Sequence, residues 1–372
     1  MIFRMGEFFN GPGGLAYGAK MAAITDRSGE EYKVEHVWAN DIDESACATY
    51  KHNILKNHQE AIVYNQPVQE LNIHELADID AFSFGFPCND YSIVGEQRGM
   101  TGDYGPLYTY GVKVINYHNP KFFIAENVGG LQSANEGKAF INILRDLASA
   151  GRGYNLTPHL YKFEEYGVPQ ARHRIIIVGI RKDLGLDFKI PVPTHSGNFV
   201  TAREAIENPP IPDDAFNHEF TKHSDKVIQM LNHIPPGENA WYEGVPEHLR
   251  LKVKGAKLSQ IYKRLHPNKP SYTVTGSGGG GTHVYHWAEP RALTNRERAR
   301  LQTFPDTFEF LGKKEKVRQQ IGMAVPPQGS KVIFEAIFKT FAGMEYDALE
   351  QSDWWKGLGI DFETETQLSL KV

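Results

Sequence analysis

Short apolar segments alternate with helix-like segments over the first ninety residues. The apolar segments 3–9, 33–40 and 78–84 are predicted to be strands, with helices between them at about 15–24 and 44–57. This alternation is typical of a parallel sheet with crossover helices. Further short apolar runs at 122–125 and 175–180 extend the sheet. We therefore expect an α/β protein with a doubly wound, mostly parallel sheet.

The pattern changes near residue 190. From there to about residue 287 the chain is rich in Pro, Gly, His and Asn, and it contains the glycine-rich run 276–281. These features predict a separate, loop-rich domain over 190–285. After it, Thr294 and Glu297 have the spacing of a capping box at the start of a helix over 294–304, and 331–341 is amphipathic. We divide the chain into 1–189, 190–285, a return to the first domain at 286–343, and an acidic extension at 344–372.

Composition adds three restrictions. A length of 372 residues suggests about two domains, and 41% hydrophobic with 23% charged residues is ordinary for a globular protein. No stretch approaches the roughly 20 apolar residues of a membrane span, and the N-terminus lacks the apolar core of a signal peptide. Two cysteines, Cys47 and Cys88, exclude a disulfide scaffold and a Cys-rich zinc site. A reducing, cytoplasmic location is expected.

Charge is unevenly distributed. The net charge of −5 argues weakly against a nucleic-acid partner, because phosphate binding usually requires a basic surface. Residues 250–300, however, contain eleven lysines and arginines against two glutamates, whereas the last thirty residues are acidic. The basic segment is compatible with DNA binding and equally with a solvated surface.

Glycines follow the first predicted strand. Gly11, Gly13 and Gly14 turn the chain from that strand into a helix, and such a turn lets backbone and helix N-terminus approach a ligand. Asp41 ends the second strand, where an acid can accept hydrogen bonds from the ribose hydroxyls of an adenosine-bearing cofactor. The alternative for Asp41 is a helix N-cap.

Cys88 and Glu126 follow two further strands. Cys88 comes just after the strand 78–84, at the edge where parallel sheets bind their ligands. It is a candidate nucleophile, although a lone cysteine is also a common small core residue. Glu126 follows the run 122–125 and is a candidate acid, with helix capping as the alternative.

Two arginines precede the run 175–180. Alternation in an extended segment puts Arg172 and Arg174 on the same side. Two guanidiniums there suit a phosphate, a carboxylate or a carbonyl oxygen. A solvated strand edge is the alternative.

Taken in order, these segments resemble the DNA cytosine-5 methyltransferases over nearly the whole chain. The likeness is carried by six motifs: Phe9-Asn10-Gly11-Pro12-Gly13-Gly14, Gly85-Phe86-Pro87-Cys88-Asn89-Asp90-Tyr91-Ser92, Glu126-Asn127-Val128, Tyr166 to Arg174, Arg291 to Glu297, and Gly322-Met323-Ala324-Val325-Pro326. Each motif is modest, but the ordered set is highly specific.

The resemblance implies a Rossmann-like catalytic domain that binds S-adenosyl-L-methionine. Cys88 would attack carbon 6 of a cytosine, Glu126 would protonate ring nitrogen 3, Arg172 would bind the base carbonyl and Arg174 would orient the site. The implied cofactor contacts are Phe9, Gly11, Gly13, Gly14, Asp41, Ile42, Val68, Gly85, Pro87 and Leu107. The implied DNA contacts are Asn89, Ser92, Asn127, Gln170 and Thr273. No metal is implied.

The resemblance also assigns larger segments. Residues 89–107 are similar to the mobile catalytic loop that closes over a flipped-out base, and 190–285 to the target-recognition domain. Within this domain, Thr273-Val274 resembles the family's recognition signature. For the glycine-rich run that follows, a flexible linker is the alternative interpretation. The expected partner is double-stranded DNA. A bacterial or phage origin, a monomer and a functional link to a restriction endonuclease fit this family.

Four positions depart from the family pattern. The residue before the cofactor loop is Glu7 where aspartate is usual, and Asn89 replaces glutamine after the nucleophile. Pro67 stands where an acid often meets the adenine amine, and Met323 replaces the asparagine of the closing motif. The departures concern cofactor affinity more than mechanism.

Three other functions are weighed. An RNA cytosine-5 methyltransferase of the tRNA-methylating branch usually has a Cys-Phe-Thr signature, and no cysteine follows residue 88. A catalytically silent DNA-binding relative is compatible with Met323. A nicotinamide oxidoreductase would explain the glycine turn and Asp41 but leaves Cys88, Glu126 and the two arginines without roles.

Overall fold

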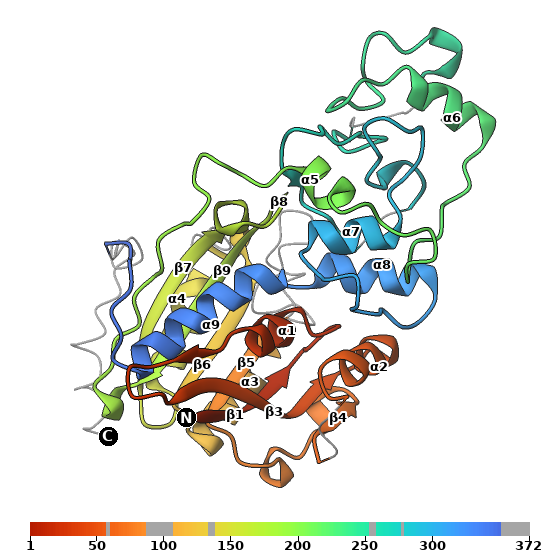
Figure 1. The fold of residues 1–372 in the computed structure, drawn as a ribbon. Helices are drawn as coiled ribbons and strands as arrows, with labels where there is room; N and C mark the ends of the chain where they lie inside the picture. Colours follow the sequence, from red (N-terminus) through yellow and green to blue (C-terminus); the bar gives the residue numbers. More distant parts are fainter. Residues whose placement is uncertain (57–59, 87–106, 133–137, 253–257, 277–278, 351–372) are drawn as a thin grey trace. The chain divides into compact units, whose positions relative to one another are not determined.

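The computed structural model describes residues 1–56, 60–86, 107–132, 138–252, 258–276 and 279–350. The chain forms two compact units. The sheet unit comprises residues 1–162, 173–192 and the chain from 330 onward, and the loop-rich unit comprises 163–172 and 193–329. Figure 1 shows the elements of both. No helix in the described part of the chain is long and apolar enough to cross a membrane.

A mostly parallel sheet is the centre of the sheet unit. Its strand order is β2 (Ile24–Thr25), β3 (Glu31–Asp41), β1 (Ile2–Phe8), β5 (Ala81–Gly85), β6 (Phe122–Val128), β9 (His173–Arg181) and β7 (Tyr154–Lys162), and β4 (Ile62–Asn65) also pairs with β3. The strand pairs β4–β3, β3–β1, β1–β5 and β5–β6 are all parallel. The carboxyl ends of β1, β3, β5 and β6 therefore share one edge, which we call the carboxyl edge. Because β9 is antiparallel, Arg174 at its start pairs with Val128 at this edge.

Helices cover both faces of this sheet, as predicted for a doubly wound fold. Phe82, Phe84 and Phe123 face the buried core formed with α3 (Tyr108–His118) and α4 (Lys138–Ser149). Phe122 has the opposite orientation, because neighbouring strand residues alternate between faces. Its ring and that of Phe3 pack on α9 (Pro327–Phe341), which crosses the sheet in Figure 1. The helices α1 (Gly14–Met21) and α2 (Glu44–Asn53) follow β1 and β3.

The predicted strands are confirmed, but several boundaries and three further strands of this sheet were not predicted. The helix expected over 15–24 ends at Met21, because Ile24 and Thr25 pair with Tyr32 and Glu31 in a hairpin. The strand expected from residue 78 begins at Ala81. The short strands β2 and β4 lack a long apolar run, and β7 contains Pro158, which an edge strand tolerates.

The loop-rich unit has little regular structure. Its helices are α5 (Ala202–Glu207), α6 (Asp225–Asn232), α7 (Asn295–Leu301) and α8 (Lys314–Met323), and β8 (Gln170–Ala171) pairs in parallel with β10 (Ser271–Tyr272). A small apolar core includes Leu231, Val245 and Tyr285. The predicted capping box is confirmed: Thr294 accepts from the Glu297 backbone N–H, and the Glu297 side chain accepts from Thr294 N.

Short 3-10 helices complete both units. They span Val68–Glu70, Ile73–Glu75, Gly129–Gln132, Phe163–Tyr166, Lys182–Leu184, Glu247–Leu249 and Gly280–Thr282.

Candidate functional site

The turn after β1 is held by glycine conformations and by Asp41. Gly11 and Gly13 have φ of 50° and 92°, in the left-handed region that favours glycine. The Gly11 N–H donates to Asp41 Oδ2 at 2.8 Å, and Gly14 begins α1. Phe9, at φ 55°, packs partly buried against the core. The turn thus presents backbone and a helix N-terminus at the carboxyl edge, as the sequence predicted.

Asp41 and Ile42 lie beside this turn. The Asp41 carboxylate also accepts from the Asp43 backbone N–H at 2.9 Å. Burial raises the pKa of Asp41, although the hydrogen bonds from Asp43 and Gly11 act in the opposite direction. Asp43, not Asp41, caps α2, so the N-cap alternative for Asp41 is wrong. The next side chain, Ile42, is apolar yet 70% exposed, so it offers an open hydrophobic surface beside the carboxylate.

A buried polar network lies behind the turn and was not predicted. The Tyr50 hydroxyl donates to Glu7 Oε2 at 3.0 Å and lies 3.3 Å from His36 Nδ1. Burial raises the pKa of Glu7 to about 8. A Cβ atom at Gly13 would lie 2.8 Å from the Tyr50 ring, so this ring packs directly against the turn. The sequence held one signal: Tyr50 lies four residues after Ala46 on the same face of an otherwise polar helix.

Glu126 and Arg174 form an ion pair at the carboxyl edge. Arg174 Nε lies 3.0 Å from Glu126 Oε1, and both side chains are largely buried. Glu126 lies within β6, which continues to Val128, and pairs with Gly85 at the end of β5. A Cβ at Gly85 would lie 3.0 Å from Glu126 Oε2, so glycine leaves room for the carboxylate. The helix-capping alternative for Glu126 is wrong, because the residue is in a strand.

The segment after Gly85 leads to the predicted nucleophile. Pro87, Cys88, Asn89 and Ser92 lie outside the described residues. The buried Asn127 donates from Nδ2 to the Phe86 carbonyl at 3.2 Å, and thereby holds the chain two residues before Cys88. Val68 and Leu107 are buried in the core of the sheet unit. The other cysteine, Cys47, is buried as well, and burial raises the pKa of its thiol to about 12.

Two motifs meet within the loop-rich unit. Gln170 is fully buried; its Nε2 donates to the Leu301 carbonyl and its Oε1 accepts from Val274 N at 2.8 Å. Thr273 Oγ1 donates to the Ala171 carbonyl at 2.7 Å. The recognition signature Thr273-Val274 is therefore fixed to the arginine motif by β8, β10 and these side chains.

Arg172 binds backbone in the same unit. Its guanidinium donates to the carbonyls of Val274 and Met323, each at 3.3 Å. The strand is interrupted at Arg172, which belongs to the loop-rich unit, whereas Arg174 belongs to the sheet unit. The interpretation of a solvated strand edge is wrong for Arg172, which is 1% exposed.

The closing motif packs against the glycine-rich run. A Cβ at Gly322 would overlap the backbone of Gly276, and a Cβ at Gly276 would lie 2.7 Å from the Gln319 carbonyl oxygen. Both positions therefore require glycine. Met323 is 62% exposed, while its carbonyl accepts from Arg172. The departure at Met323 thus leaves this backbone contact in place.

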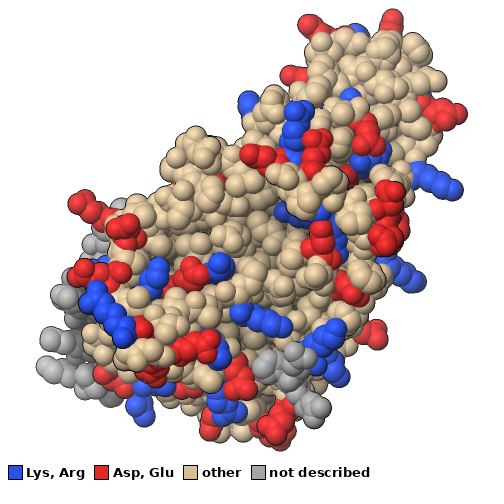
Figure 2. Space-filling view, in the orientation of Figure 1, with Lys and Arg blue, Asp and Glu red and all other residues tan. Residues whose placement is uncertain are grey.

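Four arginines of the basic segment are structural. Arg264 and Arg296 donate to backbone carbonyls, Arg291 forms a bidentate ion pair with Glu297, and Arg300 binds Asp306. Three of the four are buried and Arg291 is largely so. Their charge therefore supplies neither a DNA-binding surface nor a solvated one. On the face drawn in Figure 2, lysines and arginines are interspersed with acidic side chains.

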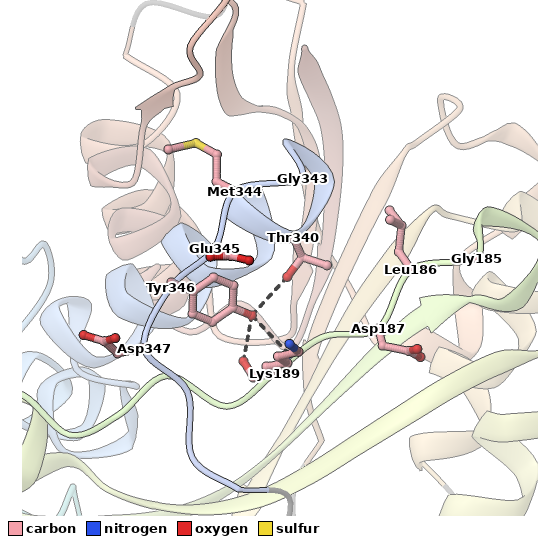
Figure 3. A pocket seen from close by; sticks show the side chains of 10 residues that line it. All are labelled: Gly185, Leu186, Asp187, Lys189, Thr340, Gly343, Met344, Glu345, Tyr346 and Asp347. Atoms are coloured by element: carbon pink, nitrogen blue, oxygen red, sulfur yellow. Dashed lines mark hydrogen bonds between the residues drawn. The ribbon is translucent and has the colours of Figure 1, made fainter.

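A cavity of about 560 Å³ lies beyond the other end of β9. Its lining includes Asp187, Lys189, Thr340, Glu345 and Tyr346, whose hydroxyl binds the backbone of Lys189 and the hydroxyl of Thr340 (Figure 3). Ile180 near this end of β9 pairs with Phe122 at the start of β6, opposite the carboxyl edge. The cavity contains no thiol, so we place the candidate site at the carboxyl edge. No cluster of metal-ligating side chains occurs among the described residues.

Comparison with known proteins identifies similar sequences. The family model of C-5 cytosine-specific DNA methylase matches residues 3–339. The chain is 64% identical to the type II methyltransferase M.BbvI of Brevibacillus brevis, over 98% of this chain and 96% of that protein. It is 30% identical to the DNA (cytosine-5-)-methyltransferase M.ApeKI of Aeropyrum pernix, over 89% and 97% of the two chains.

Solved structures show the same fold. A candidate DNA modification methyltransferase encoded within an Escherichia coli prophage matches with a TM-score of 0.64 at 22% identity, covering 91% of this chain and 99% of that chain. The Entamoeba histolytica methyltransferase EhMeth matches with a TM-score of 0.59 at 17% identity, covering 93% and 99%. At these identities the likeness concerns the fold alone.

Proposed function

This chain belongs to the family of C-5 cytosine-specific DNA methylases, and from that premise we propose that it methylates a flipped-out cytosine in a specific duplex sequence through a covalent bond between Cys88 and carbon 6 of the base. The observation that carries the proposal is the carboxyl edge of the sheet. The glycine turn, Asp41 and the Glu126–Arg174 pair lie at the strand ends there, and Gly85 ends β5 three residues before Cys88.

The residues at this edge fit S-adenosyl-L-methionine, which would supply an electrophilic methyl group. Asp41 offers a carboxylate to ribose hydroxyls, and the exposed Ile42 offers an apolar surface to the adenine. No atom of the described chain lies within 4 Å of where a Cβ at Gly11 would be, so these residues leave the turn open on that side. Phe9, Gly13 and Gly14 complete the set, with Val68, Gly85, Pro87 and Leu107 as further proposed contacts.

Cys88 supplies the nucleophile. Carbon 5 of cytosine is unreactive because the aromatic ring holds its electrons. When the Cys88 thiolate bonds to carbon 6, the electrons of the carbon 5–carbon 6 double bond shift toward carbon 5 and the ring, and carbon 5 becomes enamine-like. After carbon 5 has been methylated, a base removes its proton and the bond from Sγ to carbon 6 breaks. Because a free thiol has a pKa of about 8.5, the site must favour the thiolate.

Glu126, Arg172 and Arg174 would stabilise the charge that develops on the base. Glu126 would bind the base edge and deliver a proton to ring nitrogen 3 as carbon 6 is attacked. Arg174, 3.0 Å from that carboxylate, fixes its position. Arg172, whose guanidinium also donates to the carbonyls of Val274 and Met323, would bind the base carbonyl and stabilise its developing negative charge.

The base must leave the duplex to reach these groups, at a cost of a few kcal/mol. We assign closure over the flipped base to residues 89–107, with Asn89 and Ser92 as DNA contacts. Asn127, Gln170 and Thr273 are the other proposed DNA contacts; the first two are buried and act through the backbone they hold. Names of relatives such as M.BbvI support a role beside a cognate restriction endonuclease.

Covalent trapping tests the mechanism. Methylation of unmodified genomic DNA followed by bisulfite sequencing first identifies the target sequence. A duplex with 5-fluorocytosine at the target should then form a complex with the protein that survives denaturation, because fluorine blocks the final elimination.

Two cysteine variants make this test specific. Cys88→Ser should form no complex, whereas Cys47→Ser should trap as the wild type does, because the Cys47 thiol is buried and protonated. Efficient methylation without any trapped complex would refute the covalent step.

A further inference from the structure

Arg298 is a buried cation that forms no ion pair with a carboxylate of the described residues. Its side chain is 3% exposed; Nη2 lies 3.1 Å from His283 Nδ1, and Nε lies 3.5 Å from the Leu293 carbonyl oxygen, which is a weak contact. The adjacent Glu297 uses both carboxylate oxygens for Arg291, each at 2.8 Å. This contrasts with Arg264, Arg291, Arg296 and Arg300, whose guanidiniums are all well bonded.

Arg318 on α8 adds a second guanidinium to the same cluster. Its Nε is buried without a hydrogen-bond partner among the described residues, and no ion pair joins Arg318 to a described carboxylate. Burial, and next the charge of Arg318, lower the pKa of Arg298 to about 10. The cluster therefore has excess positive charge.

Neighbouring groups confirm the sign of this charge. Burial, and next the positive charges of Arg298 and Arg318, lower the pKa of His283 to about 4, so His283 is neutral at physiological pH. Burial lowers the pKa of Lys314; Glu219 and Glu315 raise it, and the charges of Arg298 and Arg318 lower it. Tyr272, Tyr285 and Glu297 favour the charged form of Arg298 but do not neutralise it.

The cluster lies at the glycine-rich run. Gln319 and Gly322, on the helix that carries Arg318, contact the backbone of Gly276, and His283 follows the 3-10 turn Gly280–Thr282. Among the described residues, no atom lies within 4 Å of where a Cβ at Gly279 or Gly280 would be. The backbone beside the cationic cluster is therefore open to an approaching ligand.

We propose that Arg318, the less buried member of the cluster with Arg298 and His283, binds a phosphodiester group of the DNA backbone next to the glycine-rich run. The assignment rests on the proposed function, which makes duplex DNA the substrate. An arginine fork matches the two free oxygens of a phosphodiester, and the monoanion would neutralise charge that the fold leaves uncompensated. A contact of this kind fixes the position of the duplex but does not read its sequence.

Salt dependence of DNA binding tests this site directly. Each phosphate neutralised by a basic side chain adds about 0.9 to the slope of log affinity against log salt. The full chain is titrated, without cofactor, against a fluorescent duplex between about 50 and 200 mM NaCl. Arg318→Gln should reduce the slope by about 0.9, and Arg318→Lys should retain most of it, since the charge is kept.

Lys316→Gln is the matched control, because it removes the same charge from an exposed position two residues away on α8. It should leave the slope near the wild-type value. Melting curves of all variants establish that they are folded. Equal slopes for Arg318→Gln and Lys316→Gln, with wild-type binding intact, would overturn this inference and leave the proposed function standing.

Two other results are also decisive. A wild-type chain that does not bind duplex DNA would instead refute the proposed function. Thermal stabilisation by inorganic phosphate alone, lost in Arg318→Gln, would assign the cluster to free phosphate and overturn the DNA assignment.

Discussion

Glu7 is a buried carboxyl group next to the glycine turn. It is 3% exposed, and its described partner is the Tyr50 hydroxyl at 3.0 Å. Burial raises its pKa to about 8, while the hydrogen bond from Tyr50 lowers it and the charge of Asp41 raises it. Glu7 is therefore neutral at pH 7. Glu7 is one methylene longer than the aspartate that is usual at this position. In its neutral form it binds the hydroxyl of Tyr50, whose ring packs against Gly13.

The neutral state of Glu7 predicts a pH-dependent stability. Between its ordinary pKa of 4.5 and about 8, the folded protein holds this proton and the unfolded chain does not. The stability that the raised pKa of Glu7 contributes is thus complete below pH 4.5 and is lost as pH rises through 8. Over this range the free energy of unfolding falls by up to about 1.4 kcal/mol per pH unit. Glu7→Gln keeps a neutral polar group without a titrating proton. Its free energy of unfolding should fall less steeply than that of the wild type.

Urea unfolding at several pH values between about 5 and 8 measures this difference. Glu70→Gln, at an exposed carboxylate, is the control and should follow the wild-type curve. Parallel curves for the wild type and Glu7→Gln would show that Glu7 is ionised in the folded protein.

Single residues also show where sequence reasoning stops. The glycine turn, Asp41 and Glu126 were predictable, because parallel strands bring the residues after their carboxyl ends to one edge. Which arginines of the basic segment are buried could not be predicted, because the charge of a residue in the sequence does not reveal its burial. Arg296 is fully buried and bound to main-chain carbonyls, whereas Arg298, two residues later, lacks an ion-pair partner in the described chain.

Helix α7 depends on its first turn. Thr294 is fully buried; its Oγ1 accepts from Glu297 N at 3.2 Å and lies 2.9 Å from His218 Nδ1. Glu297 in turn binds Arg291, so the cap joins three segments of the loop-rich unit. The Thr-x-x-Glu spacing predicted this cap from the sequence. The contact between Thr294 and His218 was not predicted, because the two residues are 76 positions apart.

Thr294→Ala should therefore destabilise the protein by about 1–2 kcal/mol, at the upper end for the loss of an N-cap. Thr201→Ala is the matched control, because Thr201 forms the same capping box on α5 without full burial. It should cost about 0.5–1 kcal/mol. The free energy of unfolding in urea gives both values, and an equal or smaller loss for Thr294→Ala would contradict the role of burial.

Strand prediction failed where pairing depended on distant segments. The run 175–180 was predicted as a strand, but its antiparallel direction depends on β7, which alternates polar residues and contains Pro158. This direction matters for the site. Only an antiparallel β9 places Arg174 at its start beside Val128 and within 3.0 Å of Glu126.

At the scale of the whole molecule, the compact units do not follow the order of the sequence. The loop-rich unit comprises 163–172 and 193–329, and so includes the arginine motif only as far as Arg172, together with α7 and α8. The composition change near residue 190 indicated the start of irregular structure. It did not show that Gln170 and Arg172 would bind Val274, about a hundred residues later, because such contacts leave no local pattern.

Exchanging residues 190–285 for those of a relative should move methylation to the DNA sequence that the relative methylates. The contacts across the ends of this segment decide whether such a chimera folds. Retained arginines bind main-chain carbonyls of the exchanged segment: Arg172 binds Val274, Arg296 binds Phe216 and Arg300 binds Ile206. Main-chain partners do not depend on the new side chains, so the chimera should fold. The donor segment needs a glycine matching Gly276, where a Cβ would crowd Gln319. Bisulfite sequencing identifies the methylated sequence, and an active chimera with the original specificity would show that base recognition lies elsewhere.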